Sequence, residues 1–183
     1  INIYQISENK ISVVYWGAED FSNSNQVQIG DNIKPFLLYV GDRKRYKNFN
    51  NFIKAFSINK NLKQNFKVVC FGGDEFSKKE YDLFRKLDLP IEKIIRITGG
   101  DDMLVSLYKN AKAFIFPSKY EGLGLPPLES MKQGCPVIAS NHEAIVEAVG
   151  NAAQLFDPNS IDDISEKIEE LIFSDEKTNQ LIN

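Results

Sequence analysis

Residues 115–129, Ile-Phe-Pro-Ser-Lys-Tyr-Glu-Gly-Leu-Gly-Leu-Pro-Pro-Leu-Glu, carry the pattern that decides the fold. The apolar start predicts the end of a strand, a turn broken by Gly122 and Gly124 follows, and two prolines then open a helix. Proline suits the first turn of a helix, because the N–H that it lacks would have no partner there. The N–H groups that remain near Gly124 and Leu125 lie at a helix N-terminus, which attracts anions. This strand-to-helix crossing is therefore predicted to bind a phosphate.

Two glutamates, Glu121 and Glu129, bracket this turn with seven residues between them. Carboxylates beside a phosphate repel the ligand, so their presence is explained most simply if they accept hydrogen bonds from hydroxyl groups. Sugars are rich in hydroxyl groups, which points to a nucleotide, a sugar phosphate or a nucleotide sugar as the ligand. An ordinary surface turn with two solvated glutamates is the alternative that this stretch alone leaves open.

Outside this stretch, short apolar segments alternate with helical patterns. Strands are predicted at residues 35–40, 66–71, 94–97, 113–116, 136–139 and 153–156. Helices are predicted at residues 47–57, 77–87, 101–110, 125–133, 144–149 and 160–173. Ser77 and Glu80 form a capping-box pattern at the start of the second helix. The alternation predicts an α/β fold with an open, mostly parallel Rossmann-like sheet and helices on both faces.

The segment before residue 35 has a different character. Residues 10–15 predict a short strand, and residues 20–34 are polar and asparagine-rich, which predicts a loop or connector. The chain begins with Ile1 rather than methionine, so we expect it to be a piece of a longer protein.

Length and composition fit one globular domain of 183 residues. The net charge of -3 argues against a general nucleic-acid binder. We find no apolar run of membrane-spanning length and no signal peptide, which favours a cytoplasmic protein. Cys70 and Cys135 lack metal-binding spacing and adjoin apolar segments, so we interpret them as reduced structural cysteines.

Sheets of this kind bind ligands at the carboxyl ends of their strands. Glycines, cations and hydroxyl-binding side chains follow five of the predicted strands, at residues 41–48, 72–75, 98–101, 117–122 and 140–142. Arg43 and Lys47 are the cations best placed for a diphosphate, although a solvated basic loop is the alternative. His142, the only histidine, is expected to be a bystander rather than a catalytic base.

Other nucleotide-binding motifs are missing. The sequence contains no Walker phosphate loop, and GLGLPP lacks the third glycine of a dinucleotide fingerprint and comes too late in the chain. A nicotinamide or flavin enzyme is therefore disfavoured, and no metal site is predicted.

Residues 39–158 resemble the carboxyl-terminal domain of family 4 retaining glycosyltransferases (glycosyl transferases group 1), which have the two-Rossmann-domain GT-B architecture. The matching segments are YVGDRKRYKN, FGGDE, ITGG, LVSLYKNAKAFIFPSKYEGLGLPPLESMKQGCPVIAS and EAVGNAAQLFDP. They occur in the family's order over two thirds of the chain. The resemblance implies a lead-in segment and connector at residues 1–34, a nucleotide-sugar (donor) binding domain at 35–175 and the start of a C-terminal tail at 176–183.

The resemblance also implies roles for the residues of the central turn. Glu121 would contact hydroxyl groups of the transferred sugar, and Glu129 would contact the nucleotide ribose. The N–H groups of Gly124 and Leu125 would hold the distal phosphate.

Further site residues are implied after the first three strands. Arg43 and Lys47 would neutralise the charge that develops on the leaving diphosphate. The nucleotide would approach the chain at Gly41 and Gly72, and its base would lie near Ile97 and Thr98. Many relatives carry an arginine or proline-arginine before the lysine, where this sequence has Arg45 and Tyr46. This departure leaves open whether Arg43 or Arg45 is the second cation.

The implied activity is transfer of a hexose, such as mannose, from a GDP- or UDP-sugar to a glycan or lipid-linked acceptor in bacterial surface polysaccharide synthesis. The family's retaining reaction uses neither metal nor cofactor beyond the donor, so the glutamates are not a glycosidase-like acid–base pair. The resemblance leads us to expect that the family's amino-terminal acceptor domain is missing from this sequence, and that the isolated domain binds donor weakly and is inactive. Any membrane association would be peripheral, through that missing half.

Two other functions are left open. One is a non-catalytic nucleotide-binding module of the same fold, and the other is a nucleotide-sugar epimerase. The paired glutamates with Lys47 argue against the first, and the PPLES turn fits the second less well. The sugar, the base, the acceptor and the oligomeric state are beyond what this sequence predicts.

Overall fold

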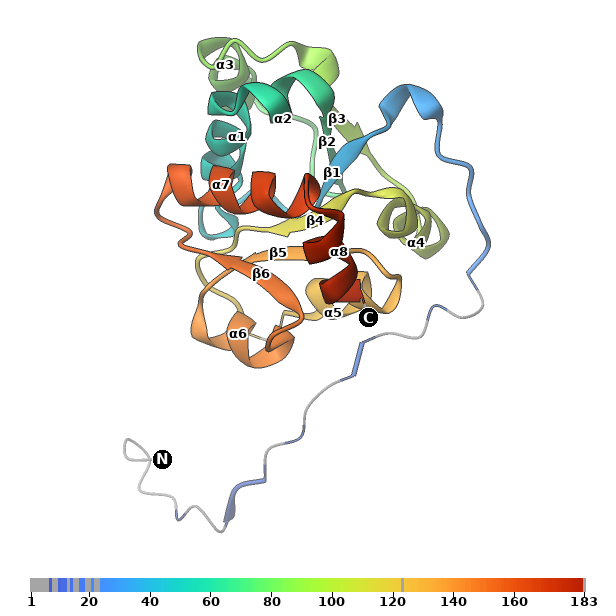
Figure 1. Ribbon diagram of the computed structural model, residues 1–183, viewed down its shortest axis with the longest axis vertical. Coiled ribbons are helices and arrows are strands. Elements are labelled where there is room, and N and C mark those ends of the chain that lie inside the picture. The colour runs from blue at the N-terminus through green and yellow to red at the C-terminus, as the bar shows by residue number, and fades with distance from the viewer. Residues whose placement is uncertain are drawn as a thin grey trace.

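The structure is a computed structural model that describes residues 24–122 and 124–182, together with residues 7, 10–12, 14, 17, 18 and 21 (Figure 1). Within these residues six parallel strands form one sheet in the order β3-β2-β1-β4-β5-β6. The strands are β1 Phe36–Val40, β2 Lys67–Phe71, β3 Ile94–Ile97, β4 Ala113–Phe116, β5 Val137–Ser140 and β6 Ala153–Phe156. This confirms the predicted open parallel α/β sheet.

The strand order reverses beside β1, which lies at the centre of the sheet. Leu37 pairs with Val68 of β2 on one side and with Ala113 of β4 on the other. Strands β2 and β3 thus lie on one side of β1, and β4, β5 and β6 lie on the other. The loops after β1 and β4 diverge at this point, which is where sheets of this type bind their ligands.

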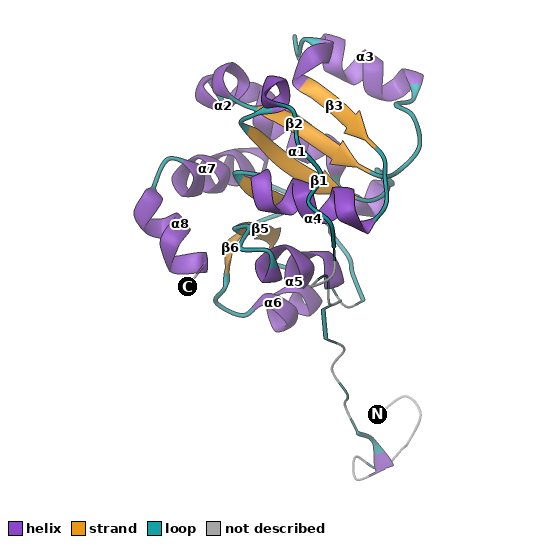
Figure 2. Ribbon diagram, turned by 90° about the vertical axis from the view of Figure 1, so that its right-hand side faces the viewer, coloured by secondary structure: helices purple, strands orange, loops and turns teal. Residues whose placement is uncertain are grey.

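Helices cover both faces of the sheet (Figures 1 and 2). One face packs against α1 Phe49–Ile58, α2 Lys60–Asn65, α3 Lys78–Lys86, α7 Ile161–Ile172 and α8 Asp175–Ile182. The other face packs against α4 Asp101–Asn110, α5 Leu125–Lys132 and α6 Glu143–Val149. In Figure 1, α1 lies to the left of the sheet and α4 to its right.

The core follows from the alternation of side chains along each strand. In β1, Leu37 and Tyr39 belong to the core under α1 and α7, whereas Phe36 and Leu38 belong to the core under α4. Both sets are buried, so β1 is a continuous apolar run, as expected of a parallel strand covered on both faces.

Most element boundaries agree with the sequence analysis. The predicted strands at 94–97, 113–116 and 153–156 and the predicted helix at 101–110 coincide with the observed elements. Helix α1 begins two residues later than predicted, because Arg45–Lys47 form a 3-10 turn and Asn48 is left-handed with φ of 57°.

The predicted strand at residues 10–15 is wrong for its described residues. Lys10 belongs to a turn, and Ile11, Ser12 and Val14 are not in a strand; residues 13 and 15 lie outside the described residues. Val14 is 77% exposed, and a strand needs a neighbouring strand to satisfy its backbone groups. The sequence analysis also missed α2 and α8.

The loop predicted at residues 20–34 is confirmed where it is described. Residues 24–30 form no helix or strand, and Asp31–Ile33 form a single 3-10 turn. Two residues tie the segment to α4: Asn25 donates its backbone N–H and its Nδ2 to the Asp102 carboxylate, and Val27 donates its N–H to the Ser106 hydroxyl at 2.8 Å. Among the described helices, none combines the length and hydrophobicity that crossing a membrane requires.

Candidate functional site

Lys47 and Glu121 meet at the carboxyl edge of the sheet, although 74 residues separate them in sequence. Lys47 ends the 3-10 turn after β1, and Glu121 lies in the turn after β4. Lys47 Nζ is 2.6 Å from Glu121 Oε1, and the two side chains are 19% and 14% exposed. The ammonium also lies 5.7 Å from the centre of the Phe116 ring. This ion pair lies at the switch point between β1 and β4, and the ligand that it would bind stays a prediction.

The N-terminus of α5 adjoins this pair. Gly124 precedes the helix in a left-handed conformation, with φ of 64° and ψ of 40°, which glycine adopts without steric cost. Pro126 and Pro127 lack N–H groups, and no side chain caps the helix. Within the described residues, the N–H groups of Gly124 and Leu125 have no hydrogen-bond acceptor. Two donors at a helix N-terminus are therefore available to an anion.

Glu129 lies one helical turn after Leu125, on the same side of α5. Its carboxylate interacts with the Tyr108 hydroxyl, which is also 3.4 Å from the Pro126 carbonyl oxygen. Burial raises the pKa of the Tyr108 phenol, and the Glu129 carboxylate raises it further. The phenol therefore stays neutral and can donate a hydrogen bond to the carboxylate. Sequence analysis missed this partner, because Tyr108 gave no signal beyond its place in an amphipathic helix.

Arg43 points to the loop after β2. Its side chain is 5% exposed, and Nε donates to Glu80 Oε1 at 2.5 Å. The guanidinium also donates to the carbonyl oxygens of Asp74 and Glu75 and lies 4.6 Å from the centre of the Phe76 ring. Arg43 thus fixes the start of α3, and its predicted role at a diphosphate stays a prediction.

Arg45, the alternative second cation, has an exposed side chain in the same loop. Its neighbour Tyr46 is 44% exposed, and the Tyr46 carbonyl oxygen accepts a hydrogen bond from the Lys119 N–H at 2.7 Å. This bond ties the loop that carries Lys47 to the loop that carries Glu121.

The predicted nucleotide-binding positions share one part of the edge. Gly41 and Gly72 end adjacent strands with φ of 108° and 79°. The Gly72 N–H donates to the Ile97 carbonyl oxygen at 3.0 Å, so the backbone hydrogen bonding between β2 and β3 continues into the turn after β2. Thr98 is exposed beside them. A planar ligand can approach the backbone here because both glycines lack Cβ.

Asn48 is a structural residue that sequence analysis missed. It is 7% exposed and left-handed, and its Nδ2 donates to the Pro158 carbonyl oxygen at 2.8 Å. The bond joins the Lys47 loop to the loop after β6. Its signal in the sequence was weak, since asparagine tolerates the left-handed conformation but does not require it.

The remaining candidates are outside the ion-pair site. His142 precedes α6, and its ring packs edge-on against Tyr120 at 5.6 Å.

Cys70 and Cys135 are free and buried, and burial raises the pKa of each thiol to about 12, consistent with structural thiols. In the part of the chain that the structure describes, no group of three or more His, Cys, Asp or Glu side chains could hold a metal ion.

Known proteins share this sequence pattern. The family model described as "Glycosyl transferases group 1" matches residues 21–183. The chain is 33% identical over 141 residues to the O-antigen chain mannosyltransferase B of Escherichia coli, covering 73% of this chain and 35% of the relative. It is 29% identical over 159 residues to the O-antigen chain mannosyltransferase RfbU of Salmonella typhimurium, covering 85% of this chain and 42% of the relative. The chain thus spans well under half the length of these relatives.

A solved structure shares the fold. The sucrose-phosphate synthase of Thermosynechococcus elongatus superposes with a TM-score of 0.70 at 19% identity, over 91% of this chain and 47% of that one.

Proposed function

Because the chain belongs to the glycosyl transferases group 1 family, we propose that it is the donor-binding domain of a retaining, metal-independent glycosyltransferase. It would transfer a hexose from a nucleotide diphosphate sugar to a glycan or lipid-linked acceptor. Mannose is the first candidate, since both O-antigen relatives are mannosyltransferases, and GDP-mannose is then the donor to test before a UDP-sugar.

The observation that carries this proposal is the contact between Lys47 and Glu121 near the N-terminus of α5, where the N–H groups of Gly124 and Leu125 have no acceptor among the described residues. A cation and two backbone donors match a diphosphate, and a carboxylate next to them matches the hydroxyl groups of the attached sugar. A non-catalytic nucleotide-binding module would need no carboxylate at this position.

In the proposed mechanism the diphosphate binds to Lys47 and to the N–H groups of Gly124 and Leu125. The ammonium passes from Glu121 to the phosphate, and the freed carboxylate accepts hydrogen bonds from the sugar. Glu129, held near Tyr108, accepts hydrogen bonds from the ribose.

During transfer the bond between the anomeric carbon and the phosphate oxygen breaks, and the acceptor oxygen bonds to the same face of that carbon. The acceptor hydroxyl gives its proton to the leaving phosphate, and Lys47 stabilises the negative charge that develops there. The part of the enzyme that binds most of the acceptor is proposed to lie outside this chain, so the chain alone would have negligible transferase activity.

Calorimetric titration of the chain with GDP, UDP and ADP in the presence of EDTA tests the donor site. We expect one nucleotide to bind, and Lys47→Met to weaken that binding about tenfold, because a charge-assisted hydrogen bond is lost. Lys44→Met is the matched control, since Lys44 is 66% exposed in the same loop and pairs with Asp42. We expect it to leave the affinity nearly unchanged.

The alternative results are informative. Equal losses in the two lysine variants would show that the loop acts only through its general positive charge. Failure of every nucleotide to bind, both to this chain and to the full-length protein, would contradict the donor-site proposal.

A further inference from the structure

A polar pocket of about 440 Å³ opens beside the ion pair, at the carboxyl ends of β4, β5 and β6. Its polar lining comes from the loops after β4, β5 and β6 and from the first residue of α6, and consists of Lys119, Asn141, His142, Glu143, Asp157 and Asn159. We propose that this pocket binds a saccharide and that it is the acceptor subsite contributed by this domain. The acceptor assignment rests on the proposed function, whereas the saccharide site itself does not.

The pocket is preformed by bonds between distant parts of the chain. The Pro158 carbonyl oxygen accepts a hydrogen bond from Asn48, 110 residues away, at 2.8 Å. Asn159 Oδ1 accepts from Lys119 Nζ at 2.7 Å, and the Asn159 N–H donates to Asp157 Oδ1 at 2.9 Å. A ligand that enters such a pocket does not have to order these loops, which favours binding.

An exposed aromatic ring stands next to the pocket. Tyr120 is 68% exposed, yet its ring is held edge-on against His142, with the ring centres 5.6 Å apart and the planes at 73°. Covering this ring with a partner would remove apolar surface from water, which is favourable. The C–H face of a sugar ring is a suitable partner for a fixed aromatic ring.

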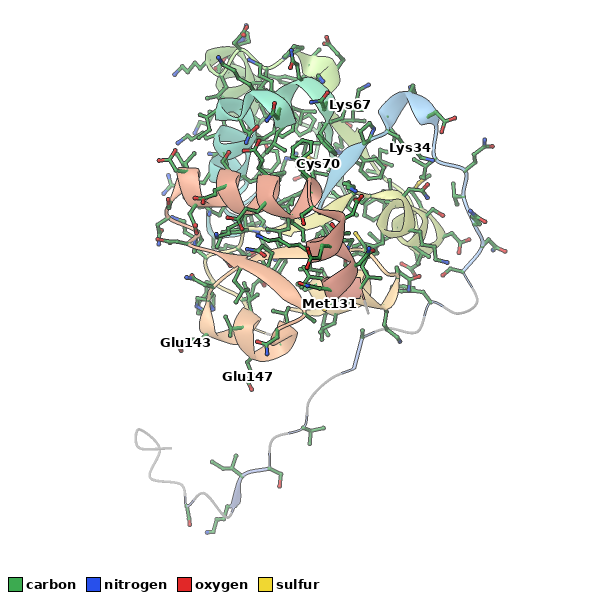
Figure 3. All side chains as sticks on the ribbon, in the orientation of Figure 1. Lys34, Lys67, Cys70, Met131, Glu143 and Glu147 are labelled. Carbon is green, nitrogen blue, oxygen red and sulfur yellow. The ribbon has the colours of Figure 1, made fainter. Side chains whose placement is uncertain are left out.

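The charge of the pocket favours a neutral ligand. Glu143 and Asp157 outnumber Lys119, and the Lys119 ammonium is already bonded to Asn159. A second phosphate group would therefore be repelled, whereas carboxylate and amide groups accept and donate hydrogen bonds with hydroxyl groups. Figure 3 shows Glu143 at the outer edge of the molecule, beside α6.

The position of the pocket on the sheet edge, relative to the proposed donor site, fits an acceptor saccharide. The predicted nucleotide positions Gly72 and Thr98 lie at β2 and β3, on one side of β1, and the pocket lies at β5 and β6, on the other. Neighbouring strands are about 4.8 Å apart, so β5 is about 10 Å from β1 across the sheet. Glu121 follows β4, between these two sides. A donor with its base at Gly72 and Thr98 and its sugar at Glu121 would thus have the pocket on the side of Glu121 that faces away from the base.

An NMR titration of the isotope-labelled chain with α-linked mannobiose tests the pocket. We expect the amide signals of Asn141, His142 and Asn159 to shift. Tyr120→Ala and Asn141→Ala should each weaken this binding about fivefold, through the lost ring contact or hydrogen bond. Both side chains are exposed, so neither substitution should unfold the chain. GDP affinity should stay within about twofold in both variants, because neither residue belongs to the donor site.

Tyr81→Ala is the matched control, since Tyr81 is a partly exposed tyrosine on α3 and lies outside the pocket. Mannobiose that shifts no pocket amide at millimolar concentrations, or that shifts only amides around Glu121 and Gly124, would overturn the inference. The same holds if Tyr120→Ala and Tyr81→Ala bind mannobiose equally well. Binding of mannobiose, with no nucleotide binding to this chain or to the full-length protein, would support the saccharide site and contradict the donor function, so the two failures are distinguishable.

Discussion

Arg43 shows how one side chain can join two loops at the carboxyl edge of the sheet. Its guanidinium is buried between the Glu80 carboxylate, two carbonyl oxygens and the Phe76 ring. It also limits its neighbours, because a Cβ atom on Gly73 would lie only 2.9 Å from Arg43 Nη1. The loops after β1 and β2 are therefore held together by Arg43, which sequence analysis had placed at the diphosphate.

We expect Arg43→Met to lower the free energy of unfolding by about 3 kcal/mol, because Glu80 would be left partly buried without its cation. Arg45→Met is the matched control, and it should change stability by less than about 0.5 kcal/mol because that side chain is exposed. Urea unfolding of both variants measures this. Unchanged stability in Arg43→Met together with a large loss of GDP affinity would instead assign Arg43 to the diphosphate.

At the scale of elements, the features that the sequence predicted well are those encoded by a few neighbouring residues. The capping box of α3 is confirmed: the Glu80 N–H donates to Ser77 Oγ, and the Ser77 N–H donates to Glu80 Oε2 at 2.7 Å. Such a motif is encoded within four residues. Helix α2 was missed because it has six residues and buries only Leu62, too little for a periodic pattern.

The site was predictable only in part, because several of its contacts join residues that are far apart in the sequence. The edge at which Lys47 and Glu121 meet follows from strand alternation, since the carboxyl ends of parallel strands share one edge. The pairing of Arg43 with Glu80 spans 37 residues, and the contact of Glu129 with Tyr108 joins two different helices. Packing alone decides such contacts, and periodicity carries no information about them.

The turn before α5 gives a prediction at this scale. Gly124→Ala should destabilise the chain by about 1 kcal/mol, because φ of 64° is strained for any residue with a Cβ atom. The cost is conformational rather than steric, since the added Cβ would lie 3.6 Å from the Ala148 Cβ. Gly122→Ala is the control in the same turn, because its φ is not positive and its surroundings are open. Equal urea midpoints for the two variants would contradict this reading of the turn.

At the scale of the whole molecule, three ion-paired carboxylates link stability to pH. Hydrogen bonds from Lys44 and from Lys177 lower the pKa of Asp42 and of Glu170, respectively. For Glu80, burial raises the pKa, but hydrogen bonds from Ser77 and Arg43 outweigh it and bring the pKa below its usual value of 4.5. The Asp42 and Glu170 pairs are surface pairs that contribute little. Glu80 should therefore dominate the acid response of this group.

The sign follows from proton linkage. Because the folded chain holds these carboxylates at a lower pKa than the unfolded chain does, the unfolded chain binds more protons as the pH falls. The stability that they contribute is complete above the unfolded pKa and is lost as the pH falls through the folded pKa.

Glu80→Gln should therefore be less stable than the parent chain at pH 7, and the difference should shrink between about pH 5 and pH 3. Glu170→Gln, which removes a surface pair, should show a much smaller difference throughout. Urea unfolding across this pH range measures the stability of both variants relative to the parent chain. If the loss of stability in Glu80→Gln does not change with pH, the Arg43–Glu80 contact stabilises the fold by packing rather than by charge.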